Sequence, residues 1–204
     1  MANYDNFNEF QLDVFREIGN IGSGNAATAL SYILKDKVNI TVPVLEVIGV
    51  NEISNILGGP ENQVVGILLS MTGQINGMLL FLLEKETTHM LLNILLNEDM
   101  QKFEDISEIG LSALMEIGNI LSGSYIGALS SLLNLEIRLT IPKISVDMVG
   151  AILNYPAAIF GEMGEKLMLI EENFFTDESS IKSHLLIMPE LESLEVILKS
   201  LGAI

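Results

Sequence analysis

A carboxylate and a carboxamide stand three positions apart at two places in the chain. Glu17 and Asn20 form the first pair, and Glu116 and Asn119 form the second. Residues three apart on an α-helix are neighbours on one face. An amide can donate and accept hydrogen bonds and so can orient a water molecule, whereas a carboxylate can bind a cation such as a partner's lysine. The pairing supports positioning chemistry and contains no nucleophile.

The two pairs are copies of one another. Each lies in the pentapeptide Glu-Ile-Gly-Asn-Ile, and the second copy follows the first by 99 positions. Aligned at that offset without gaps, residues 17–43 and 116–142 are identical at 13 of 27 positions. A match of this length predicts an internal duplication, with a period far above that of solenoid repeats. We therefore expect a single domain over residues 1–204, built from two halves at about residues 8–97 and 107–202.

Both pairs are predicted to lie on the polar side of a long helix. Between Asn8 and Leu34, apolar residues recur at spacings of three and four and form one stripe: Phe15, Ile18, Gly22, Ala26, Ala29 and Ile33. The stripe of the second helix comprises Leu114, Ile117, Leu121, Ala128 and Leu132. The opposite sides carry Asp13, Glu17 and Asn20 in the first helix, and Ser112, Glu116 and Asn119 in the second. We expect these polar faces to meet solvent or a partner.

Each of the two motifs contains a glycine, although glycine destabilises a helix. Gly19 and Gly118 each cost about 1 kcal/mol relative to alanine inside a helix. We interpret them as room for the close approach of another backbone. The run Gly22-x-Gly24-x-x-Ala27 resembles a dinucleotide fingerprint, but that motif needs a strand before it and a helix starting at it. Because the preceding residues have helical spacing, we do not expect a nucleotide site.

The segments after each long helix predict the sheet. Val38–Val50 and Ile137–Ile152 are rich in valine and isoleucine, which favours strands. Pro43 and Pro142 cannot donate to a sheet ladder, so each is expected at a strand start, an edge or a bulge. The other expected elements are a loop at 55–62, a hairpin of 64–71 and 77–84, a helix at 86–96, a polar connector at 97–105, strands at 166–172 and 183–188 around a polar turn at 173–182, and a helix at 190–201. This order predicts an α+β domain with pseudo-two-fold symmetry, in which two long motif-bearing helices pack on a largely antiparallel sheet.

Composition narrows the partners and the location. The 204 residues include 27 acidic and 10 basic residues, a net charge of −17, which repels phosphate backbones and anionic lipid. We therefore expect neither a nucleic-acid nor a membrane partner. The chain has no cysteine, which excludes disulfides and thiolate metal sites. No apolar run is long enough to span a bilayer and no secretory signal is visible, so a cytoplasmic location is expected. His89 and His184 stand alone, so we interpret each as structural or exposed and expect no metal site.

The motif positions carry a family resemblance. The pattern Asp13-x3-Glu17-x2-Asn20-x22-Pro43, repeated as Ser112-x3-Glu116-x2-Asn119-x22-Pro142, closely resembles the signature of the CheC family of chemotaxis phosphatases. All eight positions match, and the resemblance covers nearly the whole chain. It implies that the protein removes phosphate from the phospho-aspartate of a CheY-like response regulator.

The resemblance also implies roles for the residues. Glu17 or Glu116 would contact the regulator's lysine, and Asn20 or Asn119 would position the attacking water. The regulator would supply Mg²⁺, so no cofactor of the chain's own is expected. Asp13, Ser112, Pro43 and Pro142 would be supporting positions. The family also binds the receptor deamidase CheD, and two intact copies favour a monomer. The alternative is a non-catalytic adaptor that binds CheD or a flagellar switch component.

Overall fold

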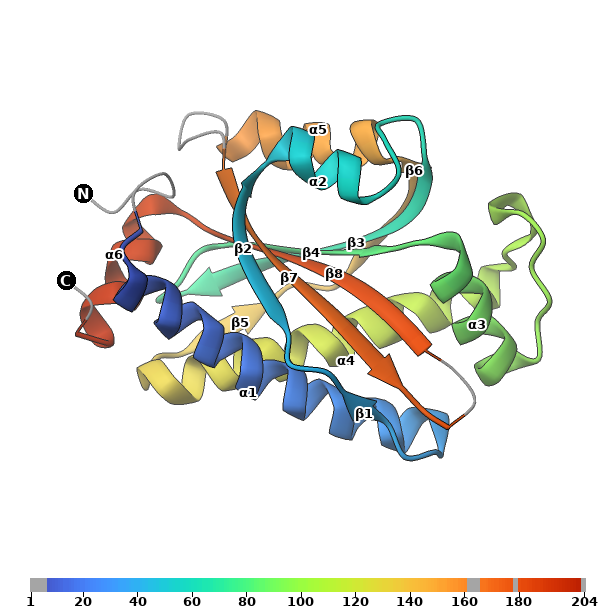
Figure 1. Cartoon of the computed structure of the whole chain (residues 1–204), viewed down its shortest axis with the longest axis horizontal. Coiled ribbons are helices and arrows are strands. Elements are labelled where there is room, and N and C mark those ends of the chain that lie inside the picture. The colour runs from blue at the N-terminus through green and yellow to red at the C-terminus, as the bar shows by residue number, and fades with distance from the viewer. Residues whose placement is uncertain (1–6, 161–165, 178–179, 203–204) are drawn as a thin grey trace.

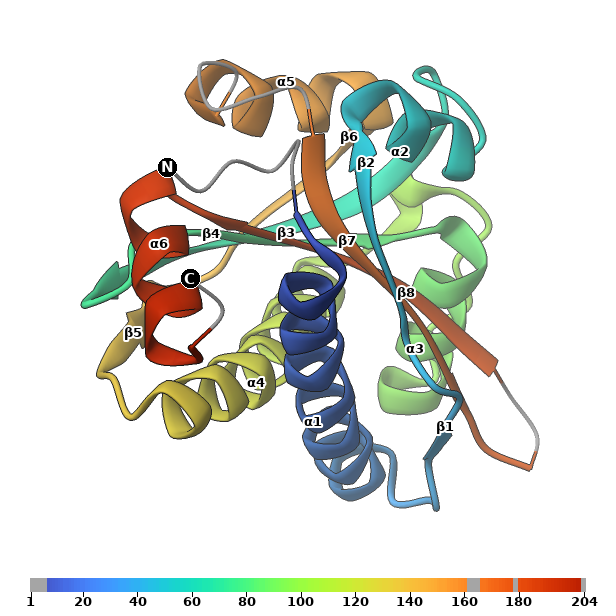
Figure 2. The same cartoon turned by 60° about the vertical axis from the view of Figure 1, so that its left-hand side comes forward.

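Two helical layers enclose one sheet (Figure 1). The computed structural model describes residues 7–160, 166–177 and 180–202. On one face of the sheet lie the long helices α1 (Glu9–Leu34) and α4 (Glu108–Leu133), and on the other face lie α2 (Val50–Ile56) and α5 (Val149–Phe160). Buried apolar side chains fill both interfaces. Figure 2 shows α1 and α4 crossing each other on the side opposite α2 and α5.

The two long helices end at equivalent residues. Lys35 follows α1 and Asn134 follows α4, and both residues adopt the left-handed conformation with φ of 53°. At its start α1 has a capping box, in which Asn8 and Gln11 exchange side-chain and backbone hydrogen bonds. The hydroxyl of Ser107 caps α4. Local capping therefore fixes which residues each helix contains, and with them the faces that carry the motifs.

The strands form a single antiparallel sheet, as predicted from the sequence. Its eight strands are β1 (Asn39–Ile40), β2 (Val44–Gly49), β3 (Gln63–Gly73), β4 (Gly77–Leu83), β5 (Ile137–Leu139), β6 (Lys143–Met148), β7 (Lys166–Phe175) and β8 (Ser180–Pro189). They follow the order β1–β7–β8–β4–β3–β5, in which β2 also pairs with β7 and β6 also pairs with β3. Each half thus sends its first strands to the hairpin of the other half. We infer from this exchange that the two halves fold as one unit.

Each motif proline lies at a one-residue bulge. From Ile40 to Val44 the chain advances by four residues, whereas their partners on β7 are three residues apart. The residues around Pro142 show the same mismatch against β3. Pro43 and Pro142 each immediately precede a strand, which confirms the expected placement.

The predicted strands after the long helices were too long. At Val50 and Val149 the chain turns into α2 and α5, neither of which was predicted. In α5 the fully buried residues Val149 and Leu153 are four apart, a helical spacing that is hidden in a run of valine and isoleucine. At the start of α2, the Glu52 carboxylate accepts a hydrogen bond of 2.8 Å from the Gly49 N–H.

The remaining predicted elements are present. The hairpin β3–β4, α3 (Lys85–Leu96) and α6 (Leu191–Ser200) match their expected positions, and both helices contribute to the core beneath α1 and α4. The predicted turn at 173–182 was too long, because β7 continues to Phe175 and β8 begins at Ser180. Residues 178–179 of that turn lie outside the described residues.

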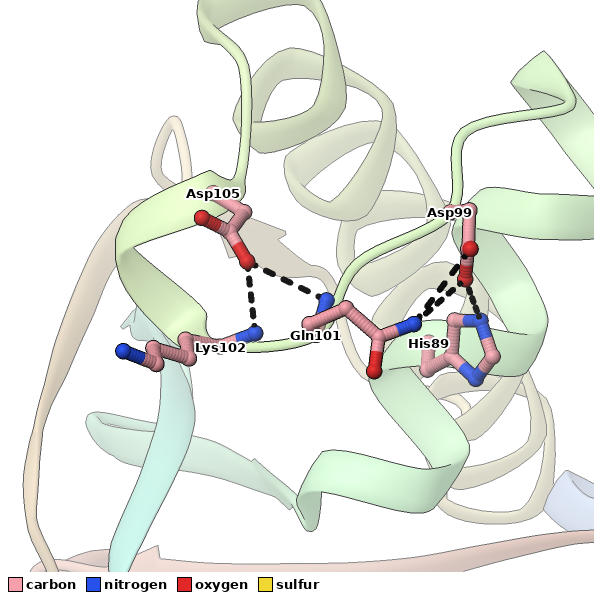
Figure 3. Close-up of polar contacts among 5 residues, drawn as sticks. All are labelled: His89, Asp99, Gln101, Lys102 and Asp105. Atoms are coloured by element: carbon pink, nitrogen blue, oxygen red, sulfur yellow. Dashed lines mark hydrogen bonds and ion pairs between the residues drawn. The ribbon is translucent and has the colours of Figure 1, made fainter.

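Side chains order the connector between the halves (Figure 3). Asp99 bonds His89 Nε2 at 3.0 Å and also accepts from the amide of Gln101. Asp105 accepts from the backbone N–H groups of Gln101 and Lys102. His89 is therefore structural, as expected. Across the described part of the chain, no helix combines the length and apolar character that a membrane span requires.

Candidate functional site

The two Glu–Asn pairs are exposed on the outer faces of the long helices. Glu17 and Asn20 project from α1, and Glu116 and Asn119 project from α4, as the spacing predicted. Within the residues that the structure describes, none of these four side chains has a hydrogen-bond or ion-pair partner. Each pair is therefore available to a partner that approaches from solvent.

Glycines seat both helices on the sheet beneath the pairs. A Cβ on Gly118 would lie 2.6 Å from Cγ2 of Ile67 on β3, and one on Gly19 would lie 3.5 Å from Cδ1 of Ile170 on β7. The neighbours are side chains of the sheet, so the expected close approach of another backbone was wrong. Helix α4 therefore packs more tightly on the sheet than α1 does. Gly118 is required by this close packing, whereas the space above Gly19 would admit a methyl group.

The buried stripes largely follow the prediction, with one error. Leu132 is 38% exposed, whereas Tyr125 of the same helix is buried. The Tyr125 ring packs over Gly22, where a Cβ would lie only 2.4 Å from the ring. This contact brings α4 onto α1 at the glycine run, which lies within helix α1 and forms no phosphate-binding loop.

The first motif positions are bonded within their own helices. Asp13 pairs with Arg16 at 2.6 Å, and both side chains are exposed. The Ser112 hydroxyl instead donates to the carbonyl of Glu108 at 2.9 Å. The two residues thus have different chemistry at equivalent positions, which favours a supporting role over a direct one.

The proline bulge runs beside the Asn20 turn of α1. On one side of the bulge, Ile40 lines a surface groove together with Gly24. On the other side, Leu45 lines a buried pocket together with Ile18. The bulge lies between these contacts and therefore passes α1 between Ile18 and Gly24. Pro43 thus lies near the turn of α1 that contains Asn20, although the two residues are 23 positions apart in the chain.

Exposed apolar residues accompany each pair and were missed from the sequence. Phe10 and its equivalent Ile109 are 57% and 68% exposed, and Val42 and its equivalent Ile141 are 80% and 85% exposed. Among the exposed large apolar side chains of the described chain, these are the two pairs related by the 99-residue offset. Phe10 precedes Glu17 by two helical turns, which places both on nearly the same face. Comparing the two halves at the 99-residue offset could have identified these apolar positions from the sequence.

Among the described residues, no three His, Asp or Glu side chains are grouped so that they could hold a metal ion. His184 is fully buried, and its pKa is lowered to about 4 by burial and by the nearby Lys182. It is therefore neutral near pH 7 and structural, as expected.

Comparison with known proteins identifies the family. A model described as the CheC-like family matches residues 10–47 and 109–146, the two segments that carry the motifs. A Bacillus subtilis protein named CheY-P phosphatase CheC is 30% identical over 207 aligned residues, covering 100% of this chain and 99% of that protein. The chain belongs to the CheC-like family.

Two proteins named FliY are also similar to this chain, one in sequence and one in fold. The B. subtilis protein named flagellar motor switch phosphatase FliY is 31% identical over 70% of this chain, a segment that makes up 37% of that longer protein. The crystal structure of Thermotoga maritima FliY has the same fold, with a TM-score of 0.74 at 22% identity, covering 97% of this chain and 98% of that one. The CheC-like fold is thus shared between chemotaxis and switch proteins.

Proposed function

We propose that this CheC-like protein is a phosphatase that hydrolyses the phospho-aspartate of a CheY-like response regulator in bacterial chemotaxis. The observation that carries the proposal is the exposed, unpartnered Glu–Asn pair that recurs on α1 and α4 of the described structure. The full-length similarity to a protein named CheY-P phosphatase supports it.

The proposed chemistry is positioning. Glu17 or Glu116 binds the regulator's active-site lysine, and Asn20 or Asn119 holds a water in line with the phosphorus. The water's oxygen forms the new P–O bond while the bond to the aspartate breaks, which releases phosphate and the free carboxylate. The Mg²⁺ in this proposal belongs to the regulator. Such a reaction asks little covalent chemistry of the second protein.

The apolar residues around each pair extend the contact. Phe10 lies on the α1 face that bears Glu17, and Val42 belongs to the bulge that passes α1 between Ile18 and Gly24. Large exposed apolar side chains are ordinary when they occur singly. Their recurrence beside both pairs supports a role in docking the regulator. We propose that the protein is a monomer, because one chain already contains both faces. We also propose that it is cytoplasmic, where a CheY-like regulator would be its substrate.

A second candidate is an adaptor that binds CheD or a flagellar switch component without catalysis. The similarity to a protein named flagellar motor switch phosphatase favours a switch component as a partner. The two readings differ in turnover. Capture of a regulator locked in its phosphorylated form, with no faster phosphate release, would support the adaptor.

Decay of phosphate on a purified CheY-like regulator tests the function. The wild-type protein should accelerate the decay, and the double variant N20A/N119A should lower the catalysed rate by roughly 100-fold or more. Each single variant should keep one working face. Thermal melting controls for folding, since both asparagines are exposed. Complete loss of activity in either single variant would contradict two independent faces.

A further inference from the structure

A buried polar bridge joins both motif helices to the sheet. Ser23 of α1 donates a hydrogen bond to Glu172 of β7 and lies 2.9 Å from the hydroxyl of Tyr125 on α4. All three side chains are buried, and Glu172 is 0% exposed. Within the described residues, Oε2 of Glu172 has no hydrogen-bond partner. The Ser23 hydroxyl thus links α1, α4 and β7 through two contacts that the phosphatase mechanism does not use.

The bridge has no counterpart at the repeat-equivalent positions of the described structure. The first residues of β2 and β6 are equivalent, and counting along their partner strands places Leu69 where β7 has Glu172. Ser122, which repeats Ser23, is buried and has no hydrogen-bond partner among the described residues. An apolar side chain therefore fits this position of the fold. Packing alone does not require the carboxyl.

The surroundings of the carboxyl favour its neutral form. Burial raises the pKa of Glu172 to about 8, and the hydrogen bond from Ser23 partly opposes the rise. The groups that face it are Ser23, Tyr125 beyond Ser23, Ser183 across the strand pair, and the bulge at residues 41–43. None of these is charged at neutral pH. The charged neighbours along β7 and β8 alternate to the other face of the sheet. Ionisation would leave a buried charge without a cation.

The bridge lies close to the N-terminal Glu–Asn pair. Ser23 follows Asn20 by three residues, a rise of about 4.5 Å along α1. We propose that Glu172 is a positioning residue for the Glu17–Asn20 face: through Ser23, its carboxyl holds α1 at the height and rotation at which Asn20 orients the water. This inference rests on the proposed phosphatase function. On α4, Tyr125 contacts Ser23 and not the carboxyl, so the α4 face has no direct bond to Glu172 and the two faces respond differently when the carboxyl ionises.

Single-face variants isolate the effect. N119A leaves only the α1 face active, and N20A leaves only the α4 face active. The rate of regulator dephosphorylation, corrected for spontaneous decay, is measured from neutral to about pH 9.5. In N119A, kcat should fall roughly tenfold as the pH passes about 8, with KM unchanged. N20A should show no such fall. Both variants act on the same regulator, so titration of the regulator cancels in the comparison.

Two substitutions in the N119A background separate positioning from packing. E172Q keeps a neutral hydrogen-bonding group, so it should retain kcat and lose the fall above pH 8. E172L installs the residue type found in the other half, so the helix should pack while kcat drops roughly tenfold at every pH. Unchanged kcat in E172L, or an equal fall with pH in N20A, would overturn the proposal.

Amide hydrogen exchange gives a readout that needs no activity. In the wild-type protein, exchange in α1 should increase above pH 8 by more than the intrinsic rate does, whereas α4 should follow the intrinsic rate. E172Q should abolish the difference. If the protein does not accelerate regulator decay, the proposed function fails. The exchange result still decides whether Glu172 holds α1 in place, and equal behaviour of the two helices would rule that out.

Discussion

The hairpins β3–β4 and β7–β8 occupy equivalent places beneath the motif helices, yet their interiors are of opposite character. The pairs are Leu68–Leu80 and Leu69–Leu79 in the first, and Glu171–His184 and Glu172–Ser183 in the second. The exposed Glu–Asn pairs above them are identical. The interior has thus diverged while the surface has not, so packing beneath the pairs did not preserve them. A requirement at the surface is the simpler explanation.

The polar hairpin keeps its buried groups neutral. Burial and Lys182 lower the pKa of His184, whose Nε2 is 3.8 Å from Glu171, and burial raises that of Glu172. Near pH 7 the His184 imidazole is therefore neutral, and the Glu172 carboxyl is protonated and also neutral. Neutral forms limit the cost of removing polar groups from water. The leucine hairpin carries no such cost, and its stability should be indifferent to pH.

The largest expected effect is a pH dependence of stability that comes from one hairpin. The pKa of Glu172 is about 8 in the folded protein, against an ordinary value of 4.5 for a solvent-exposed glutamate. Between these values the folded state binds the proton that the unfolded state releases, so the contribution of Glu172 to stability falls as pH rises through this window and is flat above it. The lowered pKa of His184 acts in the opposite direction between about 4 and 6.5, and the difference between wild type and E172L removes that contribution. The loss is on the order of 5 kcal/mol. Urea unfolding of wild type and E172L across the window measures the difference. Parallel curves would show that the carboxyl is already ionised or solvated in the folded protein.

The next effect compares the two motif glycines. Gly118→Ala should destabilise the protein by about 1–3 kcal/mol, because its Cβ meets Ile67 at 2.6 Å. Gly19→Ala meets Ile170 at an ordinary 3.5 Å and gains helix propensity, so it should be neutral or stabilising by up to about 1 kcal/mol. Denaturant midpoints of the two variants provide the test. Equal losses would mean that both helices sit equally tightly on the sheet.

The smallest effect concerns docking. F10S/I109S should raise KM for the phosphorylated regulator roughly fivefold with little change in kcat, a loss of about 1 kcal/mol of uniform binding. Y32S is the matched control. Tyr32 is 82% exposed on the same helix as Phe10, and its equivalent in the other half is already a serine, Ser131. A similar rise in KM for Y32S would assign the effect to general surface hydrophobicity.

The features that depend on local residue spacing could be predicted from the sequence. The long helices and their exposed pairs follow from periodicity, and the bulges at Pro43 and Pro142 follow from the missing donor of proline. Helix α5 was missed because its valine and isoleucine residues continue the preceding strand. Helix α2 was missed because it is short, four of its seven residues are polar, and its last two residues were predicted as part of a loop. Ser23 and Glu172 are 149 positions apart in the sequence, so no local pattern predicts their contact. Partners of this kind are set by the pairing of strands from different halves.

That exchange of strands has a consequence for how the chain is made. Strand β2 pairs with β7, which lies more than a hundred residues later, and β3 pairs with β6 from the other half. While the first half leaves the ribosome, its hairpin presents an unpaired, apolar edge, the feature by which nascent sheets aggregate. Contacts so distant in sequence also slow folding. We therefore expect the first half to depend on chaperones until the second half has been synthesised, and the sheet to close late and in a single step.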